Sequence, residues 1–493
     1  TRTTASSRDL GAGPPCSPRR FPRAAGCPRR ADDAMLANMS KPRIAPSSRL
    51  PFVWEIDGEP TLLLGGSRED NLFQIPDVEE HLDAIAAAGG NYVRCTMSSR
   101  DPGDVWPHER DEATGLYDLE RPGGEYWDRF ERFLRLTAER KIVLQIELWD
   151  RFDFARAPWF DNPFNPKNNV NYSSEESTLR ERIDTHPGEK ENPFFRSPPD
   201  LDDLPELLRL QRLVVDRLLA ATHGYDHVLY CMDNETNGDE EWASCWADYL
   251  RAYSRRERPD RPLYLTEMWD PHDLDDPMHE RTWRHPERYD FVDVSQGNHK
   301  QGQEHWDRVV SARRRLIDHD LARPLTMVKI YGANTGYYGT NRDAIERFWR
   351  ALLAGVRAVR FHRPASGLGF SEPSSACIRS ARLLEEAVPV TELEPRLDLV
   401  ERRSPNEAYC AAHADGRRVL FFCDGGDVDL VVGRAGSGGT LRGAGDAVER
   451  RVRWLDVTGA RWAGETLVAP EGDATHVRIA TPEPSGYWVA LVE

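Results

Sequence analysis

The chain has 493 residues, of which 39% are hydrophobic and 30% are charged, a composition typical of globular proteins with a sizeable core. Acidic residues number 82 against 65 basic ones, which gives a formal net charge of −17. This excess argues against a nucleic-acid partner and against an anionic membrane surface, since both favour a basic face. No apolar run in the sequence approaches the ~18 residues that a membrane-spanning helix requires.

The first part of the chain, residues 1–40, differs in composition from the rest. It is rich in Arg, Pro, Gly and Ser and lacks the hydrophobic stretch of a secretory signal. We expect a disordered or non-native leader here, with an organelle transit segment as the alternative.

A repeating unit follows, in which a short apolar β-rich run precedes a loop and an amphipathic helix. The predicted strands are Thr61–Leu64, Tyr92–Thr96, Ile142–Leu148, Val228–Asp233, Leu263–Thr266, Phe291–Val294, Leu325–Ile330 and Val359–Phe361. Eight such units predict an α/β fold, a (β/α)8 TIM barrel over residues 41–388. A doubly wound open sheet is less favoured, because it usually has six strands and a glycine fingerprint that the first turn lacks. In the barrel, functional residues are expected at the C-terminal ends of the strands.

Two further segments complete the predicted organisation. The loop after the third strand, about residues 150–199, is long and rich in aromatic residues, which predicts an ordered lid or wall. From Ala408 the hydrophobic period changes to two, with Gly, Asp and Pro turns between the runs. Residues 389–493 are therefore predicted to form a small antiparallel β-sandwich.

The most informative motif is HVLYCMDNETNGDEEW, residues 227–242, in which the fourth strand ends at Asp233, Asn234 and Glu235. It resembles clan A glycoside hydrolases, retaining (β/α)8 glycosidases in which an Asn-Glu pair ends the fourth strand. Arg94, in NYVRCTM, is similar to the arginine that ends the clan's second strand. The opening LLLGG and the terminal β-module resemble the apiosidase-like group. The resemblance spans roughly residues 50–493 and implies that Glu235 is the general acid/base.

The chemistry of glycosidic bond cleavage also points to Glu235 as a proton donor. A glycosidic oxygen is a poor leaving group, and a carboxylic acid with a raised pKa can protonate it. Asp233 and the acidic run after Glu235 are expected to raise that pKa, and Asn234 can hold a sugar hydroxyl. The alternative is that Glu235 simply begins a helix, where negative charge is favourable.

The second carboxylate departs from the clan pattern. The clan's nucleophile is a Glu that ends the seventh strand, and here LTMVKIYG places Lys329 there. We predict Glu267 of the fifth strand as the partner, which suits an inverting arrangement with carboxyls ~6.5–9.5 Å apart. Asp293 of the sixth strand is an alternative, and a third possibility is that no partner exists. If these residues have structural roles rather than catalytic ones, we expect Glu267 to form a salt bridge to Arg94 or Lys329 across the barrel mouth. Asp293 would then be a buried, hydrogen-bonded strand residue.

Other side chains are predicted at the barrel mouth. Lys329 either binds a substrate oxygen, belongs to a structural ion pair or forms a Schiff base. Asn298 and His299 follow the sixth strand, and His362 and Arg363 follow the eighth. Four tryptophans at strand ends or in the following loops are candidate sugar platforms: Trp106, Trp149, Trp159 and Trp269. The predicted substrate-binding set is Arg94, Trp149, Asn234, His299, Lys329 and His362.

No metal and no cofactor are predicted. The eight cysteines are scattered without a C-x-x-C pair, which argues against a zinc ribbon or a dense disulfide framework and favours a reducing compartment. The acidic and histidine-rich segment 270–280 fits neither an EF-hand nor a helical H-x-x-x-H site. The sequence thus predicts a cytoplasmic glycoside hydrolase for short glycosides. The alternatives are a non-catalytic carbohydrate-binding barrel and a Lys-dependent aldolase or lyase, and the oligomeric state stays open.

Overall fold

The computed structural model describes residues 41–336, 338–432, 449–470 and 475–493. The predicted leader, residues 1–40, therefore lies outside the described residues. Within these ranges, no helix is both long and apolar enough to span a lipid bilayer.

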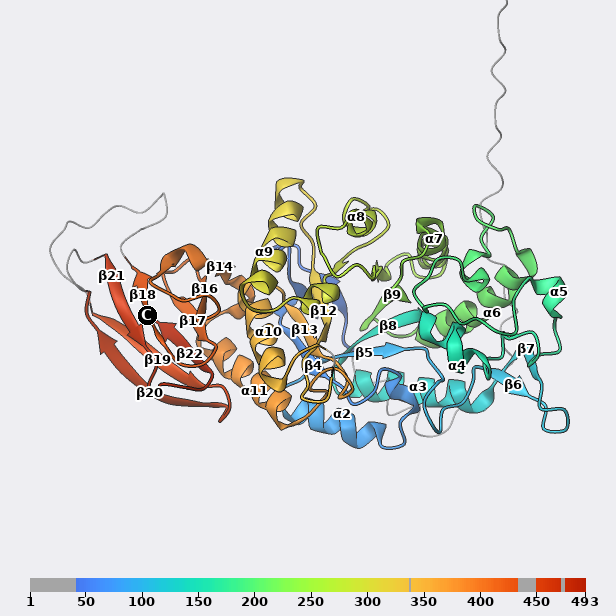
Figure 1. The fold of residues 1–493 in the computed structure, drawn as a ribbon, viewed down its shortest axis with the longest axis horizontal. Coiled ribbons are helices and arrows are strands. Elements are labelled where there is room, and N and C mark those ends of the chain that lie inside the picture. The colour runs from blue at the N-terminus through green and yellow to red at the C-terminus, as the bar shows by residue number, and fades with distance from the viewer. Residues whose placement is uncertain (1–40, 337, 433–448, 471–474) are drawn as a thin grey trace, which may run out of the picture.

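Eight parallel strands occupy the centre of the larger domain within the described residues (Figure 1). They are β4 (Leu63–Gly66), β5 (Tyr92–Thr96), β8 (Val143–Asp150), β9 (Val228–Asn234), β10 (Tyr264–Thr266), β11 (Val292–Asp293), β12 (Leu325–Ile330) and β13 (Ala358–Phe361). They form two four-stranded sheets, ordered β10-β9-β8-β5 and β11-β12-β13-β4. Main-chain hydrogen bonds from Asn91 to Leu64 (2.9 Å) and from Asp290 to Leu265 (2.8 Å) join the sheets at both edges. This arrangement is consistent with a TIM barrel, and each predicted strand overlaps an observed one.

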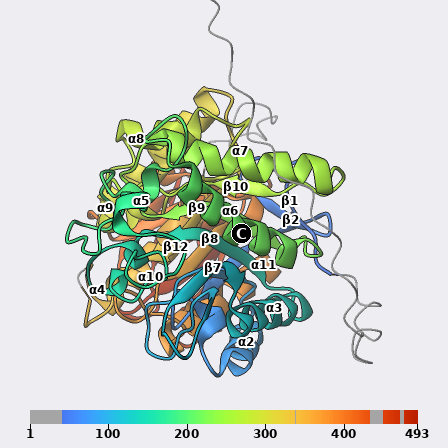
Figure 2. The same cartoon turned by 90° about the vertical axis from the view of Figure 1, so that its right-hand side faces the viewer.

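A helix follows each of these strands in the described chain, and Figure 2 shows helices lying around the strands. The helices are α2 (Val78–Ala87), α3 (Gly124–Glu139), α6 (Pro205–Thr222), α7 (Glu240–Glu257), α8 (Pro277–Trp283), α9 (Gly302–Asp318), α10 (Asn341–Leu353) and α11 (Glu372–Ala387). Their apolar faces are buried against the strands. In α3, for example, Trp127, Phe130 and Leu134 are buried, as the periodicity predicts.

The N-terminal end of the barrel is covered by a small antiparallel sheet of β1 (Ile44–Pro46), β2 (Trp54–Ile56) and β3 (Glu59–Thr61). Trp54 is fully buried there, with its ring edge-on to Phe291 at 5.3 Å and Tyr264 at 5.7 Å between centroids. Large apolar side chains thus fill this end, which leaves the C-terminal ends of the strands for function.

The long third loop is ordered and has an apolar core of its own. It contains the short helices η2 (Arg151–Phe154), α4 (Arg156–Trp159), α5 (Ser174–Ser177) and η3 (Pro193–Arg196). Phe154 and Phe194 stack at 3.9 Å between centroids, and Phe164 packs edge-on to Phe194 at 5.0 Å. The hairpin of β6 (His108–Arg110) and β7 (Tyr117–Pro122) lies in the preceding loop. The aromatic residues therefore build a wall beside the barrel mouth.

The C-terminal part consists of two antiparallel sheets. A six-stranded sheet contains β14 (Glu394–Pro395), β16 (Ala408–Ala412), β17 (Arg418–Phe422), β22 (Trp488–Val492), β19 (Arg450–Asp456) and β20 (Arg461–Val468). A three-stranded sheet contains β15 (Val400–Glu401), β18 (Asp427–Val431) and β21 (His476–Ala480). Side chains of both sheets share one buried cluster, which fits the predicted β-sandwich.

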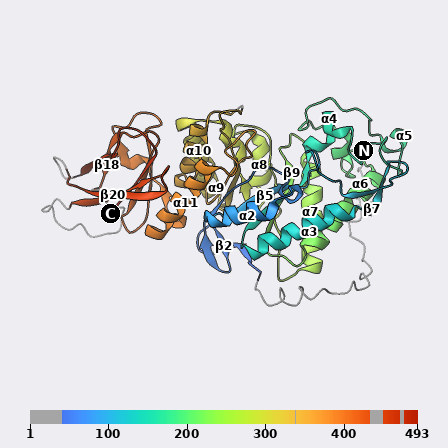
Figure 3. The ribbon, with the colours of Figure 1, turned by 90° about the horizontal axis from the view of Figure 1, so that it is seen from below.

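This β-domain packs against the barrel through the outer face of its six-stranded sheet. The rings of Trp349 in α10 and Phe421 in β17 stack at 5.7 Å between centroids. Buried residues of α10, α11 and the sheet belong to one apolar cluster. Seen from below in Figure 3, the β-domain lies beyond α10 and α11. The two parts therefore share a core.

Candidate active site

Glu235 is the residue immediately after β9, at the C-terminal end of the fourth barrel strand. Its backbone is left-handed, with φ 52°, a conformation that costs a non-glycine residue ~1–3 kcal/mol and is concentrated at functional sites. Its carboxylate lies 2.7 Å from Lys329 Nζ and accepts a hydrogen bond from the Tyr331 hydroxyl at 2.9 Å. The Glu235 side chain is 18% exposed and that of Lys329 only 2%, so solvent reaches this pair through the carboxylate.

The electrostatics of Glu235 differ from the sequence expectation. Burial alone would raise the pKa of its carboxyl, but the Lys329 ammonium and the Tyr331 hydroxyl outweigh burial and hold the pKa well below its ordinary value of 4.5. Asp233, expected to raise that pKa, instead accepts hydrogen bonds from Arg151 (2.9 Å) and Trp242 (3.2 Å). Glu235 is therefore an ionised carboxylate at neutral pH.

Asn234 connects the predicted site residues across the barrel. Its Oδ1 accepts hydrogen bonds from Lys329 Nζ at 2.5 Å and from Arg94 Nη2 at 3.0 Å. Its Nδ2 donates to Asp150 Oδ1 at 2.9 Å. Asn234, Arg94 and Lys329 are thus brought together, and the amide fixes where the Lys329 ammonium lies.

Arg94 belongs to a buried group of charged residues that also contains Glu147 and Asp70, which the sequence pattern did not identify. Its guanidinium donates to both carboxylate oxygens of Glu147 and to Asp70 Oδ1 at 2.5 Å. Glu147 lies in β8, which runs two residues past the predicted end to Asp150. A charged residue inside the apolar run IVLQIELW is the signal that could have marked Glu147, because buried charges are nearly always paired.

Glu267, the predicted catalytic partner, lies apart from the Glu235 pair. Its Oε1 accepts main-chain hydrogen bonds from Asp233 at 3.0 Å and from Met268 at 2.7 Å. No ion pair or hydrogen bond in the described part of the chain joins it to Glu235, Lys329 or Arg94, so the alternative salt bridge is also not formed. Burial and the neighbouring Asp233 carboxylate raise the pKa of Glu267 well above its ordinary value.

Asp293, the other proposed partner, is held by local hydrogen bonds. Its carboxylate accepts from the Ser295 amide at 2.8 Å and the Ser295 hydroxyl at 3.0 Å, and burial raises its pKa to about 7. It is a buried, hydrogen-bonded strand residue, which matches the structural alternative.

A row of rings, which we call the ring wall, lies beside Glu235. It consists of His272, His299, Tyr331, Tyr338 and His362. The two imidazoles of His272 and His299 stack at 3.3 Å with 7° between their planes. His299 meets Tyr331 at 5.0 Å and Tyr338 at 4.5 Å, and Tyr331 meets His362 at 5.1 Å. The structure thus places the predicted His299 and His362 on one wall next to the carboxylate.

Both predicted histidines of the ring wall are neutral. Burial, and then the neighbouring His272, lower the pKa of His299 to about 3. Burial also lowers the pKa of His362 well below its ordinary value, although Asp70 opposes it. Neutral imidazoles can both donate and accept hydrogen bonds, as recognition of hydroxyl groups requires.

Trp149 does not lie at this site. It is 3% exposed and packs against Trp246 at 5.3 Å and Phe194 at 5.4 Å between centroids. The end of β8 directs this ring into the core beside α7, so it cannot serve as a sugar platform. Trp159 and Trp269 are likewise buried. The tyrosines and histidines of the ring wall, which sequence spacing did not group, supply the aromatic surface instead.

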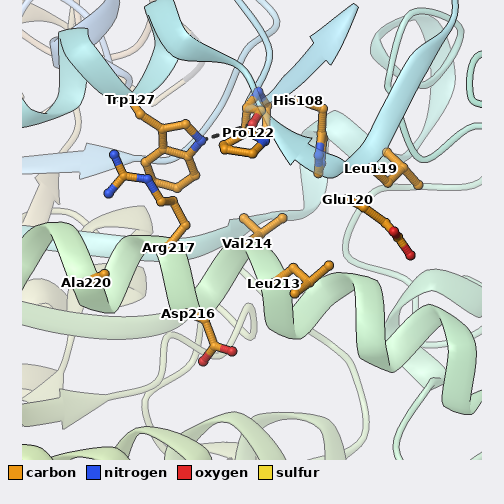
Figure 4. A pocket seen from close by; sticks show the side chains of 11 residues that line it. His108, Leu119, Glu120, Pro122, Trp127, Leu213, Val214, Asp216, Arg217 and Ala220 are labelled. Atoms are coloured by element: carbon orange, nitrogen blue, oxygen red, sulfur yellow. Dashed lines mark hydrogen bonds between the residues drawn. The ribbon is translucent and has the colours of Figure 1, made fainter. Parts of the chain in front are cut away.

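Two further features are the predicted acidic loop and a cavity on the outside of the barrel. The predicted acidic loop contributes His272 to the ring wall, and the described residues contain no cluster of three or more His, Cys, Asp or Glu side chains able to hold a metal. A cavity of about 270 Å³ lies on the outside of the barrel, between β7, α3 and α6, lined by Trp127, Leu213 and Val214 among others (Figure 4). It contains none of the predicted site residues.

Comparison with known proteins gives structural neighbours only. No protein-family model and no curated protein matches the chain. A glycoside hydrolase family 5 structure from Bacteroides vulgatus ATCC 8482 aligns with TM-score 0.59 and 11% identity, over 91% of this chain and 93% of that one. A second structure, described as a glycoside hydrolase, aligns with TM-score 0.59 and 10% identity, over 91% and 96%. At such identity the likeness shows a shared fold, which extends over the barrel and the β-domain.

Proposed function

We propose that the protein is a glycoside hydrolase of the TIM-barrel type, with Glu235 as its catalytic carboxylate and a carbohydrate as its substrate. The observation that carries the proposal is the position of Glu235: a partly exposed, ionised carboxylate on strained backbone at the end of the fourth strand. The solved neighbours of this fold are glycoside hydrolases. The finer similarity to the apiosidase-like group, drawn from the sequence, is part of the proposal.

The ionised state of Glu235 determines which step it performs. A carboxylate can accept a proton from an attacking water or attack the sugar itself, but it cannot give a proton first. With an aryl glycoside, the glycosidic C–O bond breaks in the same step and the leaving group departs as a phenolate, which needs no proton donor. Lys329 and Tyr331 stabilise the negative charge on one side, and the ring wall supplies aromatic and hydroxyl groups for the sugar. Glu267 is left out of the mechanism, because its side chain is buried and no described contact joins it to the Glu235 pair. Its Oε1 accepts from main-chain amides, and its Oε2 is buried without a partner.

A non-catalytic sugar-binding barrel is the second candidate, and Lys329 is the observation that favours it. An ammonium group occupies the place of the clan nucleophile and neutralises Glu235 at 2.7 Å. The aldolase alternative is weaker, because a Schiff-base lysine must be a free amine and Lys329 Nζ donates to Asn234 and faces Glu235.

The test is turnover of a panel of short aryl glycosides by the parent chain, Glu235→Gln and Glu241→Gln. Glu241 is an exposed carboxylate in the first turn of α7 and provides the matched control. We expect the rate to fall by about 10²–10⁴-fold in Glu235→Gln and to stay unchanged in Glu241→Gln. Sugar binding without turnover by the parent chain would support the binding barrel, and unchanged turnover in Glu235→Gln would refute the assigned role.

A further inference from the structure

Arg347 of α10 is a buried arginine that binds main-chain carbonyls. It is 0% exposed, and its Nε donates to the Lys300 carbonyl at 3.0 Å. Its Nη1 donates to the carbonyls of Tyr331 at 2.9 Å and Tyr338 at 2.6 Å. A buried charge that spans three carbonyls fixes the distances between them, because a lost hydrogen bond leaves a desolvated group unpaired.

These carbonyls belong to two of the loops that carry the ring wall, those with His299 and with Tyr331 and Tyr338. Lys300 follows η4 (Ser295–His299), the segment that ends with His299. Tyr331 and Tyr338 lie in the loop after β12, and the Tyr331 hydroxyl binds Glu235. Arg347 therefore clamps the two loops together behind the ring wall.

The neighbours of Arg347 on the same helix bind the β-domain. Asn406, between β15 and β16, donates from Nδ2 to Glu346 Oε2 at 2.9 Å. Its Oδ1 accepts from Arg350 Nη1 at 2.7 Å, and Arg350 also donates to Glu346 at 2.8 Å. Asn406 has φ 61°, a left-handed conformation that Asn tolerates better than most residues. The Asn406 amide is thus hydrogen-bonded to residues of α10 on both sides of Arg347, Glu346 and Arg350.

The same segment of the β-domain, residues 402–407, also meets the start of α9. A Cβ placed on Gly302, the first residue of α9, would lie 3.6 Å from Asn406. Next to it, the Arg403 guanidinium donates to Gln303 Oε1. The β-domain therefore contacts both helices that continue from these loops, α9 at its first residues and α10 at Glu346 and Arg350.

We infer that the β-domain is a positioning part of the candidate site: segment 402–407, through Asn406 and α10, holds the Arg347 clamp that sets the ring-wall loops in place. Arg347 and Asn406 are positioning residues, and their importance for turnover rests on the proposed function. The hydrogen bonds of the Arg347 clamp do not depend on the proposed function. A displaced α10 would break hydrogen bonds to both loops together, so loosening is expected in both loops at once.

Hydrogen exchange of the full chain tests this directly. We compare the parent with Asn406→Gly, which keeps the backbone freedom but removes the amide, and with Arg347→Met. Arg451→Ala is the control, because it removes an exposed ion pair with Glu493 elsewhere in the β-domain. Amides in residues 295–300 and 331–336 are expected to exchange about tenfold faster in both variants and unchanged in the control. Arg347→Lys, which keeps fewer donors, should fall between parent and Arg347→Met.

A spectroscopic reading separates positioning from general loosening. The His299 imidazole should titrate closer to 6.5 in Asn406→Gly than in the parent, where burial keeps its pKa at about 3. Parent-like exchange in both loops of Asn406→Gly would overturn the inference, as would faster exchange confined to the β-domain. If neither the parent nor any variant turns over a glycoside, the proposed function fails while exchange still decides the inference. If the parent is active, a rise in KM larger than the fall in kcat supports it, and unchanged KM in Arg347→Met overturns it.

Discussion

Replacing Lys329 by Met gives the clearest energetic test of the Glu235 pair. The substitution removes an ammonium group that is 2% exposed and 2.7 Å from the carboxylate. Breaking a buried pair by removing one partner costs ~3–5 kcal/mol. Because the Glu235 side chain is 18% exposed, we expect the lower part of that range, about 3 kcal/mol at pH 8. Asn234 Oδ1 keeps its bond from Arg94, so the loss falls mainly on Glu235.

The cost must depend on pH with a defined sign. In the parent, the folded pKa of Glu235 lies below 4.5, so the pair contributes stability above that pH and loses it as the pH falls through the folded pKa. In Lys329→Met the folded pKa lies above 4.5, so the variant loses stability as the pH rises. The difference between parent and variant should therefore begin to grow at the parent's folded pKa, below pH 4.5. It should rise by at most ~1.4 kcal/mol per pH unit until the pH passes the variant's folded pKa, so it should be smaller at pH 4.5 than at pH 8.

The assay is the midpoint of unfolding from pH 4.5 to 8, for the parent, Lys329→Met, Glu235→Gln and the double variant. The pH dependence caused by Lys329→Met should shrink when Glu235 is already Gln, because one titrating partner is gone. An equal loss of stability at pH 4.5 and 8 would show that Glu235 is not the charge that Lys329 balances, and the reasoning would be refuted.

Three further predictions follow from the same contacts. Tyr331→Phe removes the hydroxyl that donates to Glu235 at 2.9 Å, and kcat/KM should fall by about tenfold. An unchanged kcat/KM would show that the Tyr331 hydroxyl has no part in turnover. Glu267 has a raised folded pKa, so it contributes stability below its unfolded pKa and loses it as the pH rises. Glu267→Gln should therefore gain stability relative to the parent between pH 5 and 8, with turnover retained; lost turnover would restore Glu267 as a catalytic residue. Trp149→Ala should lower the free energy of unfolding by ~3–5 kcal/mol through a core cavity, measured by urea unfolding, and a stable variant with raised KM would instead indicate a sugar platform.

The strands were readable from the sequence because each is an apolar run bounded by loops and followed by a helical period. β5 and β12 were predicted with their observed bounds. β8 was not: it begins one residue later than predicted, at Val143, and continues through Trp149 to the polar Asp150. Hydrophobicity marks where a strand is buried, and hydrogen bonding to β9 extends this one into its polar end.

The proximity of several candidate residues was predictable from the sequence, and their electrostatics were not. Asn234 ends β9 and Glu235 follows it, whereas Arg94, expected at the end of its strand, lies in the middle of β5. Barrel closure brings these strands around one interior, so the proximity of the three residues follows from topology. The pKa of Glu235 follows from Lys329, which is distant in sequence, and the acidic residues beside it in sequence have other partners. Likewise, the spacing around Trp149 does not reveal whether its ring faces the barrel or the helices.

The central claim is that the Glu235 carboxylate acts at the reacting carbon of a sugar, either as the nucleophile or through an attacking water. Chemical rescue of Glu235→Ala measures this: azide, a small anion, can enter the space that the carboxylate leaves and attack that carbon. With an aryl glycoside that the parent cleaves, we predict that azide restores turnover and that a glycosyl azide appears by mass spectrometry. Turnover by the parent with no azide adduct and no rescue in Glu235→Ala would contradict the account.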